Sequence, residues 1–305
     1  MIAVIAGGVG AARFLRGLLD VVDPADVTAI VNTADDIVLH GLHISPDLDT
    51  VTYTLAGAIN PETGWGLDHE TWQAMTLLER YGGEAWFRLG DRDLATHLYR
   101  TQRLGEGARL SEVTAEITRT WGLGLRVLPM SDDPVTTMVT VPDDGEIGFQ
   151  EYFVGRRHAV ATEKVRFAGV EAAAPAPGVL AAIAGAARVV IAPSNPIVSI
   201  GPVLALPGLR EALADVRDRT VAISPIVAGA ALKGPADRML ADLGHESSVV
   251  GVAKIYREVA ASLVIDRADA GRAGEVEAEG MAVVVTDTVM RDVGVAAALA
   301  RAVLA

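Results

Sequence analysis

The sequence predicts an α/β protein with a Rossmann-like, mostly parallel, doubly wound sheet and a helical insertion. Two observations predict this fold: short apolar runs of the kind that form buried parallel strands, and apolar residues at helical spacing between those runs. A length of 305 residues suits one large α/β domain that carries a subdomain.

The N-terminal residues form the most distinct unit. Residues 2–6 are a continuous apolar run, residues 27–31 predict a second buried strand, and residues 11–19 between them have helical spacing. Residues 7–10, which join the first run to the helix, read Gly-Gly-Val-Gly. Strand, glycine loop, helix and strand in this order predict a βαβ unit.

The residues that follow predict a helical insertion. Residues 32–50 are expected to form a loop rich in Asp, His, Gly and Pro. Helices are predicted over residues 51–58, 69–81, 91–103 and 111–121. We therefore expect an α/β core made of residues 1–60 and 125–305, interrupted by a mostly helical subdomain of residues 61–124.

The alternation of strands and helices resumes in the rest of the chain. Strands are predicted over residues 125–128, 136–141, 147–153, 188–192, 220–224, 262–266 and 282–286. Helices are predicted over residues 179–186, 208–216, 235–243, 252–260 and 290–304. Strands that alternate with helices in this way favour a doubly wound sheet.

The composition excludes several classes of function. The chain has 26 Lys and Arg against 39 Asp and Glu, a net charge of −13, which disfavours binding to nucleic acid or to an anionic membrane. It has no Cys, and therefore no disulfide, thiol nucleophile or thiolate metal site. No apolar run reaches the ~18 residues of a membrane span, and the N-terminal residues lack the basic region of a signal peptide. We expect a cytoplasmic protein.

The glycine loop is the first candidate binding site. Gly7, Gly8 and Gly10 would let the backbone approach a phosphate, and the amide groups of the following helix would point at it. Arg13, one helical turn further on, would add a cationic contact. The dinucleotide pattern GxGxxG fails because position 13 is Arg, which disfavours a nicotinamide oxidoreductase. A tight turn without a ligand is the alternative.

The residues after the second predicted strand are the second candidate site. In open α/β sheets, ligands bind beyond the carboxyl ends of the strands, where Asn32 would lie. Residues 32–50 contain no Lys or Arg, although they contain Asp35, Asp36, Asp47, Asp49, His40 and His43. So many carboxylates favour a hard cation such as Mg²⁺ between them. Helix caps and Asx turns are the alternative for one or two of these Asp residues.

A local supply of cations follows in the predicted insertion. Arg88 lies shortly before a predicted helix that Asp91 would cap, and Arg side chains suit bidentate recognition of phosphate. For Arg100 and Arg103, we expect a solvated position or pairing with Asp91 and Asp93.

Three polar turns follow predicted strands later in the chain. Residues 130–134 read Met-Ser-Asp-Asp-Pro, and Ser194 and Asn195 stand between two prolines. Residues 224–235 carry Lys233, which would reach a phosphate. Because all three turns come after strands, we expect them at one edge of the sheet, where they would form a crevice.

Several of these segments together resemble one family. The segments are AGGVGAARFLRGL, VNTADD, HGLHISPDLDTVTYTLAG, LGDRDLATHL, LPMSDDPV and PSNPIVSIGP. In this order they resemble the CofD family, the 2-phospho-L-lactate transferases of coenzyme F420 biosynthesis, from residue 2 to about residue 252.

The resemblance implies a reaction and its partners. A phospholactyl or phosphoenolpyruvyl group would move from a guanosine-diphosphate-linked donor to the hydroxyl of the deazaflavin FO, with Mg²⁺ as cofactor and release of GMP. The resemblance does not decide between the phospholactyl and the phosphoenolpyruvyl donor. The resemblance also implies a homodimer.

The resemblance further implies roles for individual residues. The glycine loop of residues 7–10, with Ser194 and Asn195, would hold the donor and its phosphates. Asp35 and Asp49 would hold Mg²⁺. Asp49 and Arg88 would contact FO, and Asp49 is the candidate group for assisting deprotonation of the FO hydroxyl. A metal-ligand role and a base role for Asp49 remain alternatives.

One alternative belongs to a different class. A group related to the CofD family shares the glycine-loop fold and is linked to control of carbon metabolism, so the chain could be a nucleotide-binding regulator without transferase activity. The SPDLDT and LGDRD segments favour the transferase.

Overall fold

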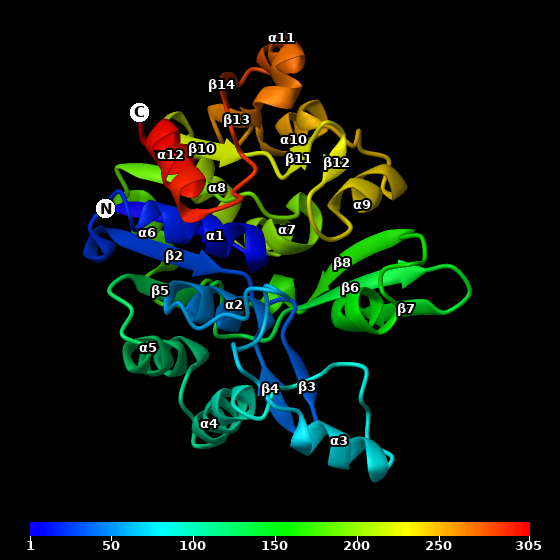
Figure 1. Cartoon of the computed structure of the whole chain (residues 1–305). Helices are drawn as coiled ribbons and strands as arrows, with labels where there is room; N and C mark the ends of the chain where they lie inside the picture. The colour runs from blue at the N-terminus through cyan, green and yellow to red at the C-terminus, as the bar shows by residue number, and fades with distance from the viewer.

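The central element of the computed structural model, which describes all 305 residues, is a seven-stranded parallel sheet (Figure 1). The sheet confirms the predicted α/β class. Its strands, in spatial order, are β14 (Ala282–Thr286), β13 (Ser262–Asp266), β10 (Thr220–Ile223), β9 (Arg188–Ile191), β1 (Ile2–Ala6), β2 (Val27–Val31) and β5 (Arg126–Pro129). All seven were predicted from apolar runs, with ends that differ by at most one residue.

The strand order reverses beside β1. From β1 the chain proceeds outward through β2 to β5, and the later strands start again on the other side of β1 with β9. In doubly wound sheets, this reversal leaves a crevice beyond the carboxyl ends of the two strands. The loops after β1 and β9 therefore flank the place where a ligand is expected.

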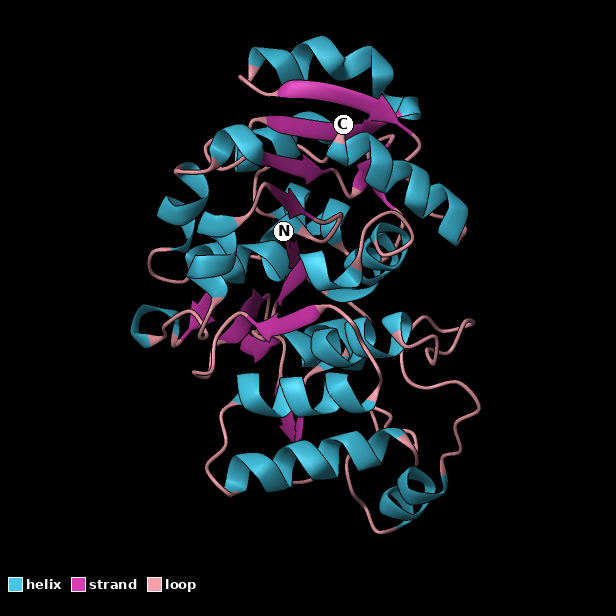
Figure 2. Ribbon diagram, turned by 90° about the vertical axis from the view of Figure 1, so that its left-hand side faces the viewer, coloured by secondary structure: helices cyan, strands magenta, loops and turns pink.

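Two hydrophobic cores cover the two faces of the sheet. Figure 2 shows helices on both sides of its strands. Side chains of β1 alternate between them: Val4 and Ala6 pack in one core, while Ala3 and Ile5 pack in the other. The first core is closed by α1 (Gly8–Leu18), α2 (Pro46–Leu55), α5 (Leu110–Thr120) and α12 (Val293–Leu304). The second is closed by α6 (Val179–Gly185), α7 (Gly201–Ala205), α8 (Leu209–Ala214), α9 (Ala236–Asp242), α10 (Val249–Tyr256) and α11 (Ala273–Ala278).

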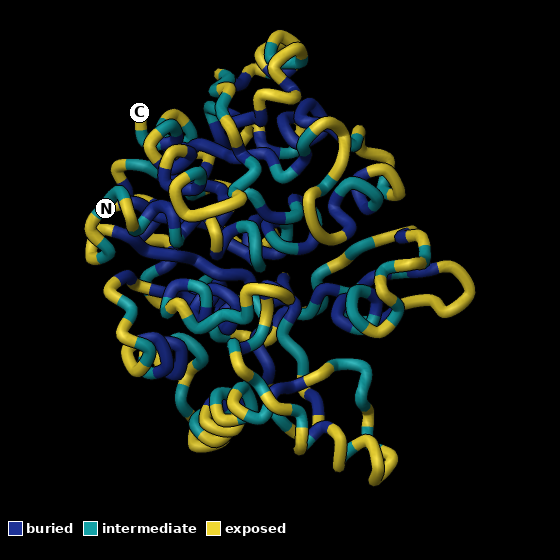
Figure 3. Tube along the Cα trace, in the orientation of Figure 1, coloured by how far each residue is buried: buried dark blue, intermediate teal, exposed yellow.

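The connection from β2 to β5 extends from the sheet. It contains a hairpin of β3 (Ile37–Leu39) and β4 (Leu42–Ile44), then α2, α3 (Gln73–Arg80), α4 (Asp93–Gly105) and α5. Figure 1 shows β3, β4, α3 and α4 together at the lower end of the molecule, and Figure 3 shows many exposed residues there. Residues 61–124 contain α3, α4 and α5, but their division from the core at these boundaries stays a prediction.

A second sheet follows β5. It is antiparallel, in the order β7 (Gly145–Gly148), β6 (Thr136–Val141) and β8 (Lys164–Ala168). A short hairpin of β11 (Ile226–Val227) and β12 (Ala230–Ala231) completes the strands. None of the helices combines the length and the apolar composition needed to cross a bilayer.

Three local predictions are wrong. Residues 32–50 are not one loop, because apolar residues on both sides of the turn at Gly41 pair as β3 and β4. Helix α2 begins at Pro46 instead of residue 51, since proline suits the first turn of a helix. The strand expected over 147–153 ends at Gly148, and Glu151–Gly155 form a π-helix that packs aromatic rings together.

The contact of α1 with α12 yields a prediction about stability. A Cβ at Gly17 would lie 2.3 Å from the carbonyl carbon of Ala296, so Gly17→Ala must push the two helices apart. We expect a loss of about 1–3 kcal/mol in the free energy of unfolding, measured by urea denaturation. Gly105→Ala, at the end of α4 where a Cβ meets no atom within 4 Å, is the control and should be neutral or stabilising. Equal stabilities of the two variants would contradict the prediction.

Candidate active site

The glycine loop follows β1, at the reversal of the strand order. Gly8 has a left-handed backbone with φ +69°, and a Cβ at Gly10 would lie 2.1 Å from the carbonyl oxygen of Pro193. The Ser194 hydroxyl donates a hydrogen bond to the Gly7 carbonyl at 2.6 Å. The structure thus brings Gly7, Gly8, Gly10 and Ser194 together. Since close packing alone accounts for Gly10, a phosphate at the loop stays a prediction.

An acidic pair faces this loop. Asp47, in the first turn of α2, accepts a hydrogen bond from the Gly8 amide. The side-chain amide of Asn32, just after β2, donates to both Asp35 and Asp47, with 3.1 Å to each carboxylate oxygen. We call Asp35 and Asp47, joined by Asn32, the acidic pair. The amide group at the start of α1 therefore already points at a carboxylate.

The acidic pair carries unbalanced negative charge. Burial, and then the charge of Asp47, raise the pKa of Asp35 well above its usual value. Burial raises the pKa of Asp47 to about 6. One Asp35 oxygen is buried without a hydrogen-bond partner. A buried carboxylate with a free oxygen beside a second carboxylate is an arrangement that a hard cation would stabilise.

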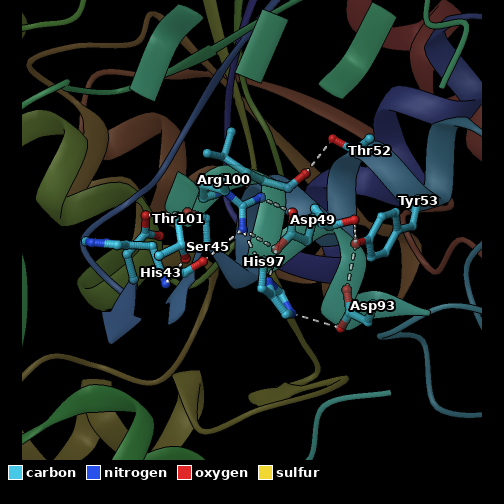
Figure 4. A network of polar contacts seen from close by, with 12 residues as sticks. His43, Ser45, Asp49, Thr52, Tyr53, Asp93, His97, Arg100 and Thr101 are labelled. Carbon is cyan, nitrogen blue, oxygen red and sulfur yellow. Dashed lines mark hydrogen bonds and ion pairs between the residues drawn. The ribbon is translucent and has the colours of Figure 1, made fainter. Parts of the chain in front are cut away.

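Asp49 lies two residues after Asp47 in α2, but its carboxylate already has a cationic partner. Both of its oxygens accept hydrogen bonds from the Arg100 guanidinium, with the Nη1–Oδ2 distance at 3.1 Å (Figure 4). Arg100 is 2% exposed, so the expectation that it is solvated or paired with Asp91 and Asp93 is wrong. The structure therefore gives Asp49 a buried ion pair with the insertion.

Three more side chains complete this buried network. His97 of α4 is 1% exposed, with Nδ1 at 3.3 Å from Arg100 Nη1 and Nε2 at 3.3 Å from an Asp93 oxygen. The Tyr53 hydroxyl donates to the other Asp93 oxygen at 2.6 Å. Potential metal ligands of Asp49, Asp93 and His97 lie within 4.8 Å of one another, but the guanidinium already supplies a cation there.

The sequence analysis missed this network. Asp93, His97 and Arg100 are spaced by four and three residues, so they share one face of α4. That spacing indicated that the three side chains lie together. The upstream acidic residues 32–50, which include no Lys or Arg, were a possible source of a carboxylate partner for Arg100. Nothing in the sequence alone showed that the two segments meet.

Other predicted contacts of α4 differ in detail. Arg103 pairs with Glu106 and Glu116 and not with the aspartates upstream of it. Asp91 does not cap its own helix; it accepts hydrogen bonds from the amides of Gln73 and Ala74 and so caps α3. It thereby ties α3 to the start of α4.

Asp36, which directly follows Asp35 of the acidic pair, is a further carboxylate of this region. Ser45 donates to one of its oxygens at 2.6 Å, and the other oxygen is buried without a partner. Burial raises the pKa of Asp36 well above its usual value, and the Arg100 charge opposes that rise. Arg100 therefore stabilises two aspartates of the upstream segment.

The remaining predicted site residues lie in several parts of the molecule. Arg13 is exposed on α1, and Arg88 is exposed with its guanidinium carbon 4.6 Å from the centre of the Trp72 ring. Asn195 caps the following π-helix by accepting from the Ile197 amide at 2.9 Å. Lys233 reaches the insertion, because its Nζ would be 3.3 Å from a Cβ at Gly64. The binding roles of these residues stay predictions.

The fold and this site define a Rossmann-like α/β protein with a candidate anion-binding edge at the switch point of its sheet. The chain belongs to the CofD family: the sequence model of the family described as 2-phospho-L-lactate transferase CofD matches residues 2–303. This match confirms the family that the sequence motifs indicated.

Similar proteins agree with this assignment, and a solved structure has a similar fold. A protein of Streptomyces griseus named phosphoenolpyruvate transferase is 50% identical over 99% of this chain and 97% of its own length. A protein of the same name from Mycolicibacterium smegmatis is 42% identical over 99% and 97%. A Bacillus halodurans protein of the UPF0052 family has a similar fold, with a TM-score of 0.67 and 18% identity over 100% of this chain and 98% of that one.

The buried ion pair yields a prediction about stability. Arg100→Met leaves the Asp49 charge buried and unpaired, so we expect a loss of about 3–5 kcal/mol in the free energy of unfolding. Adding Asp49→Asn should recover part of that loss in a double-mutant cycle by urea denaturation. Arg103→Met, which breaks ion pairs at the surface, is the control and should cost far less. Independent, additive effects of the two substitutions would refute the coupling.

The acidic pair yields a prediction about pH. The folded state binds a proton at Asp47 more tightly than the unfolded chain does, so stability is lost as pH rises from about 4 to about 6. Asp47→Asn cannot ionise and should be more stable than the wild type above pH 6, with a gap that shrinks toward pH 4. Urea denaturation in metal-free buffer measures the gap. Asp20→Asn, at an exposed position, should show no such trend; a pH-independent gap for Asp47→Asn would count against the raised pKa.

Proposed function

We propose that this protein transfers a phosphoenolpyruvyl group from a guanosine-diphosphate-linked donor to the hydroxyl of the deazaflavin FO, in coenzyme F420 biosynthesis. Membership of the CofD family supports a transferase, and the names of its relatives favour phosphoenolpyruvate over phospholactate in the donor. The structural observation that carries the proposal is the acidic pair opposite the glycine loop.

The proposed reaction is a displacement at phosphorus. The FO hydroxyl oxygen forms a bond to the phosphorus that carries the enolpyruvyl group. The bond from that phosphorus to the oxygen of GMP breaks, GMP leaves with this oxygen, and the hydroxyl proton passes to solvent or to a site carboxylate. Catalysis of such a step depends mainly on positioning and on charge stabilisation.

We propose that Asp35 and Asp47 hold Mg²⁺. The pair fits a hard cation, because Asp35 has a buried oxygen without a partner and both groups are oxygen donors. When bound, Mg²⁺ supplies positive charge to the diphosphate of the donor. Asp49, the second ligand suggested by the family resemblance, is less suited, since Arg100 occupies both of its oxygens.

The chain's own groups then act on the donor and the acceptor. Amides of the glycine loop and the Ser194 loop would bind the phosphates, and Asn32 keeps the two carboxylates at a fixed separation. Arg13 and Lys233 are exposed cations that would contact the donor, and Arg88 would contact FO. Asp49 would act through its ion pair, which holds the first turn of α2 and with it Asp47.

The proposal is tested by product analysis. The protein is incubated with FO, Mg²⁺ and either the phosphoenolpyruvyl or the phospholactyl donor, and the product is identified by mass spectrometry. We expect the enolpyruvyl product and GMP in equal amounts. Asp47→Asn should lower turnover by at least about a hundredfold because it removes a metal ligand, and Asp20→Asn should retain full turnover. No product from either donor would reject the proposal.

Metal binding by the acidic pair has a direct readout. Mn²⁺ titration followed by electron paramagnetic resonance should show one site that Asp35→Asn and Asp47→Asn weaken and Asp20→Asn leaves unchanged. Retention of that site in both acidic-pair variants would assign the metal elsewhere. The homodimer implied by the family resemblance is tested separately by light scattering.

A further inference from the structure

The antiparallel sheet of β7, β6 and β8 contacts the segment that carries Asp35. The Thr137 amide, near the start of β6, donates a hydrogen bond to the Ala34 carbonyl at 2.7 Å. The Gln150 side-chain amide donates to the Asp35 carbonyl at 3.2 Å, across 115 residues of sequence. Both contacts lie outside the main sheet, so the second sheet is fixed directly to the residues that follow β2.

Thr137 contacts the side chain of Asp35 as well as the backbone of its segment. The Thr137 hydroxyl makes a polar contact with the Asp35 carboxylate, and both residues are buried. The Asn32 amide donates to Asp35 Oδ2 at 3.1 Å, whereas Asp35 Oδ1 is buried without a hydrogen-bond partner. Polar groups thus hold the Asp35 carboxylate, its carbonyl and the carbonyl before it, while one carboxylate oxygen stays available to a ligand.

Packing fixes the two residues that hold Asp35. Val139 of β6 packs with Phe149 and Tyr152 in a separate small hydrophobic core. Thr137, two residues before Val139, lies on the same face of β6 because side chains of a strand alternate. Gln150 stands between the two aromatic residues in sequence and directly precedes the π-helix. Ring packing on both sides of Gln150 therefore restrains the position of its side-chain amide.

The same small core contacts the other side of the crevice. Val198 belongs to this core and to the π-helix Pro196–Ile200, which follows the Ser194 loop. A Cβ at Gly201, just after that π-helix, would lie 3.1 Å from the Phe167 ring of β8. The second sheet therefore packs against the Ser194 loop and against the Asp35 segment, and it restrains the separation of the two.

We propose that Thr137 and Gln150 are positioning residues, which orient Asp35 so that its free oxygen and the Asp47 carboxylate meet one divalent cation. The inference rests on the proposed metal site. Gln150 acts through the Asp35 carbonyl and Thr137 through the carboxylate. Loss of a residue that orients a metal ligand typically weakens metal binding by about ten- to a hundredfold. The alternative is that the second sheet only stabilises the fold.

The test measures Mn²⁺ binding by electron paramagnetic resonance and stability by urea denaturation, on the full chain. Thr137→Val keeps the shape of the side chain but removes the hydroxyl, so the Kd for Mn²⁺ should rise about tenfold or more. Thr137→Ser restores the hydroxyl and should recover most of the affinity. Gln150→Met removes the amide donor and should also raise the Kd. Thr140→Val makes the same change on the opposite face of β6 and is the matched control, with no expected effect.

Several outcomes would overturn the inference or its basis. An unchanged Mn²⁺ affinity in Thr137→Val and Gln150→Met, at a site that Asp35→Asn weakens, would overturn the positioning role while the proposed function stands. An equal loss of affinity in Thr140→Val, or a Thr137→Ser variant as weak as Thr137→Val, would reduce the role to stabilising the fold. If Thr137→Val does not fold, Gln150→Met decides alone. A Mn²⁺ site unaffected by Asp35→Asn would remove the proposed metal site itself, and the inference with it.

Discussion

The buried ion pair between Arg100 and Asp49 is the interaction on which the candidate site depends. Asp49 belongs to α2, which packs against the sheet, and Arg100 belongs to α4, which lies outside it. The pair therefore fixes the insertion to the helix that also carries Asp47. Desolvating two charges is costly, and only a bidentate contact with further polar partners offsets that cost. His97, Asp93 and Tyr53 supply those partners.

This pair also divides the carboxylates of the acidic segment into two groups. Asp49 pairs directly with the Arg100 guanidinium, and the Arg100 charge also opposes the rise in the pKa of Asp36. Asp35 and Asp47 have neutral groups as their hydrogen-bond partners: the amides of Asn32 and Gly8, and the side chain of Thr137. Neutral donors orient a carboxylate but do not cancel its charge. The unbalanced pair is consequently where an external cation would gain the most.

Much of the fold was predictable from the sequence. Buried parallel strands read as continuous apolar runs, because both of their faces are covered. The βαβ unit, all seven strands of the main sheet and the positions of most helices followed from that pattern. The hairpin of β3 and β4, the π-helix at Glu151 and strand β8 did not, since short antiparallel strands with mixed burial have no such run.

The site was predictable only in part, and for a different reason. Residues of the glycine loop, Asn32 and Ser194 were identified because each follows a strand of the sheet, and strand ends converge by topology. Arg100 was misjudged because its partner lies 51 residues earlier, and no periodicity links the two. Long-range pairing of charge is decided by packing, which a local pattern does not encode.

The core and the insertion contribute different residues to the candidate site. The core contributes the glycine loop, Asn32 and the acidic pair, all near strand ends of the rigid sheet. The insertion contributes Arg100 and Arg88, on helices and turns that cover less apolar surface. The ends of parallel strands hold the side chains that follow them at fixed separations, as they do for Asn32 and the acidic pair. Because the Arg100–Asp49 pair is a buried charge contact that joins these parts, it helps to fix the position of the insertion relative to the acidic pair.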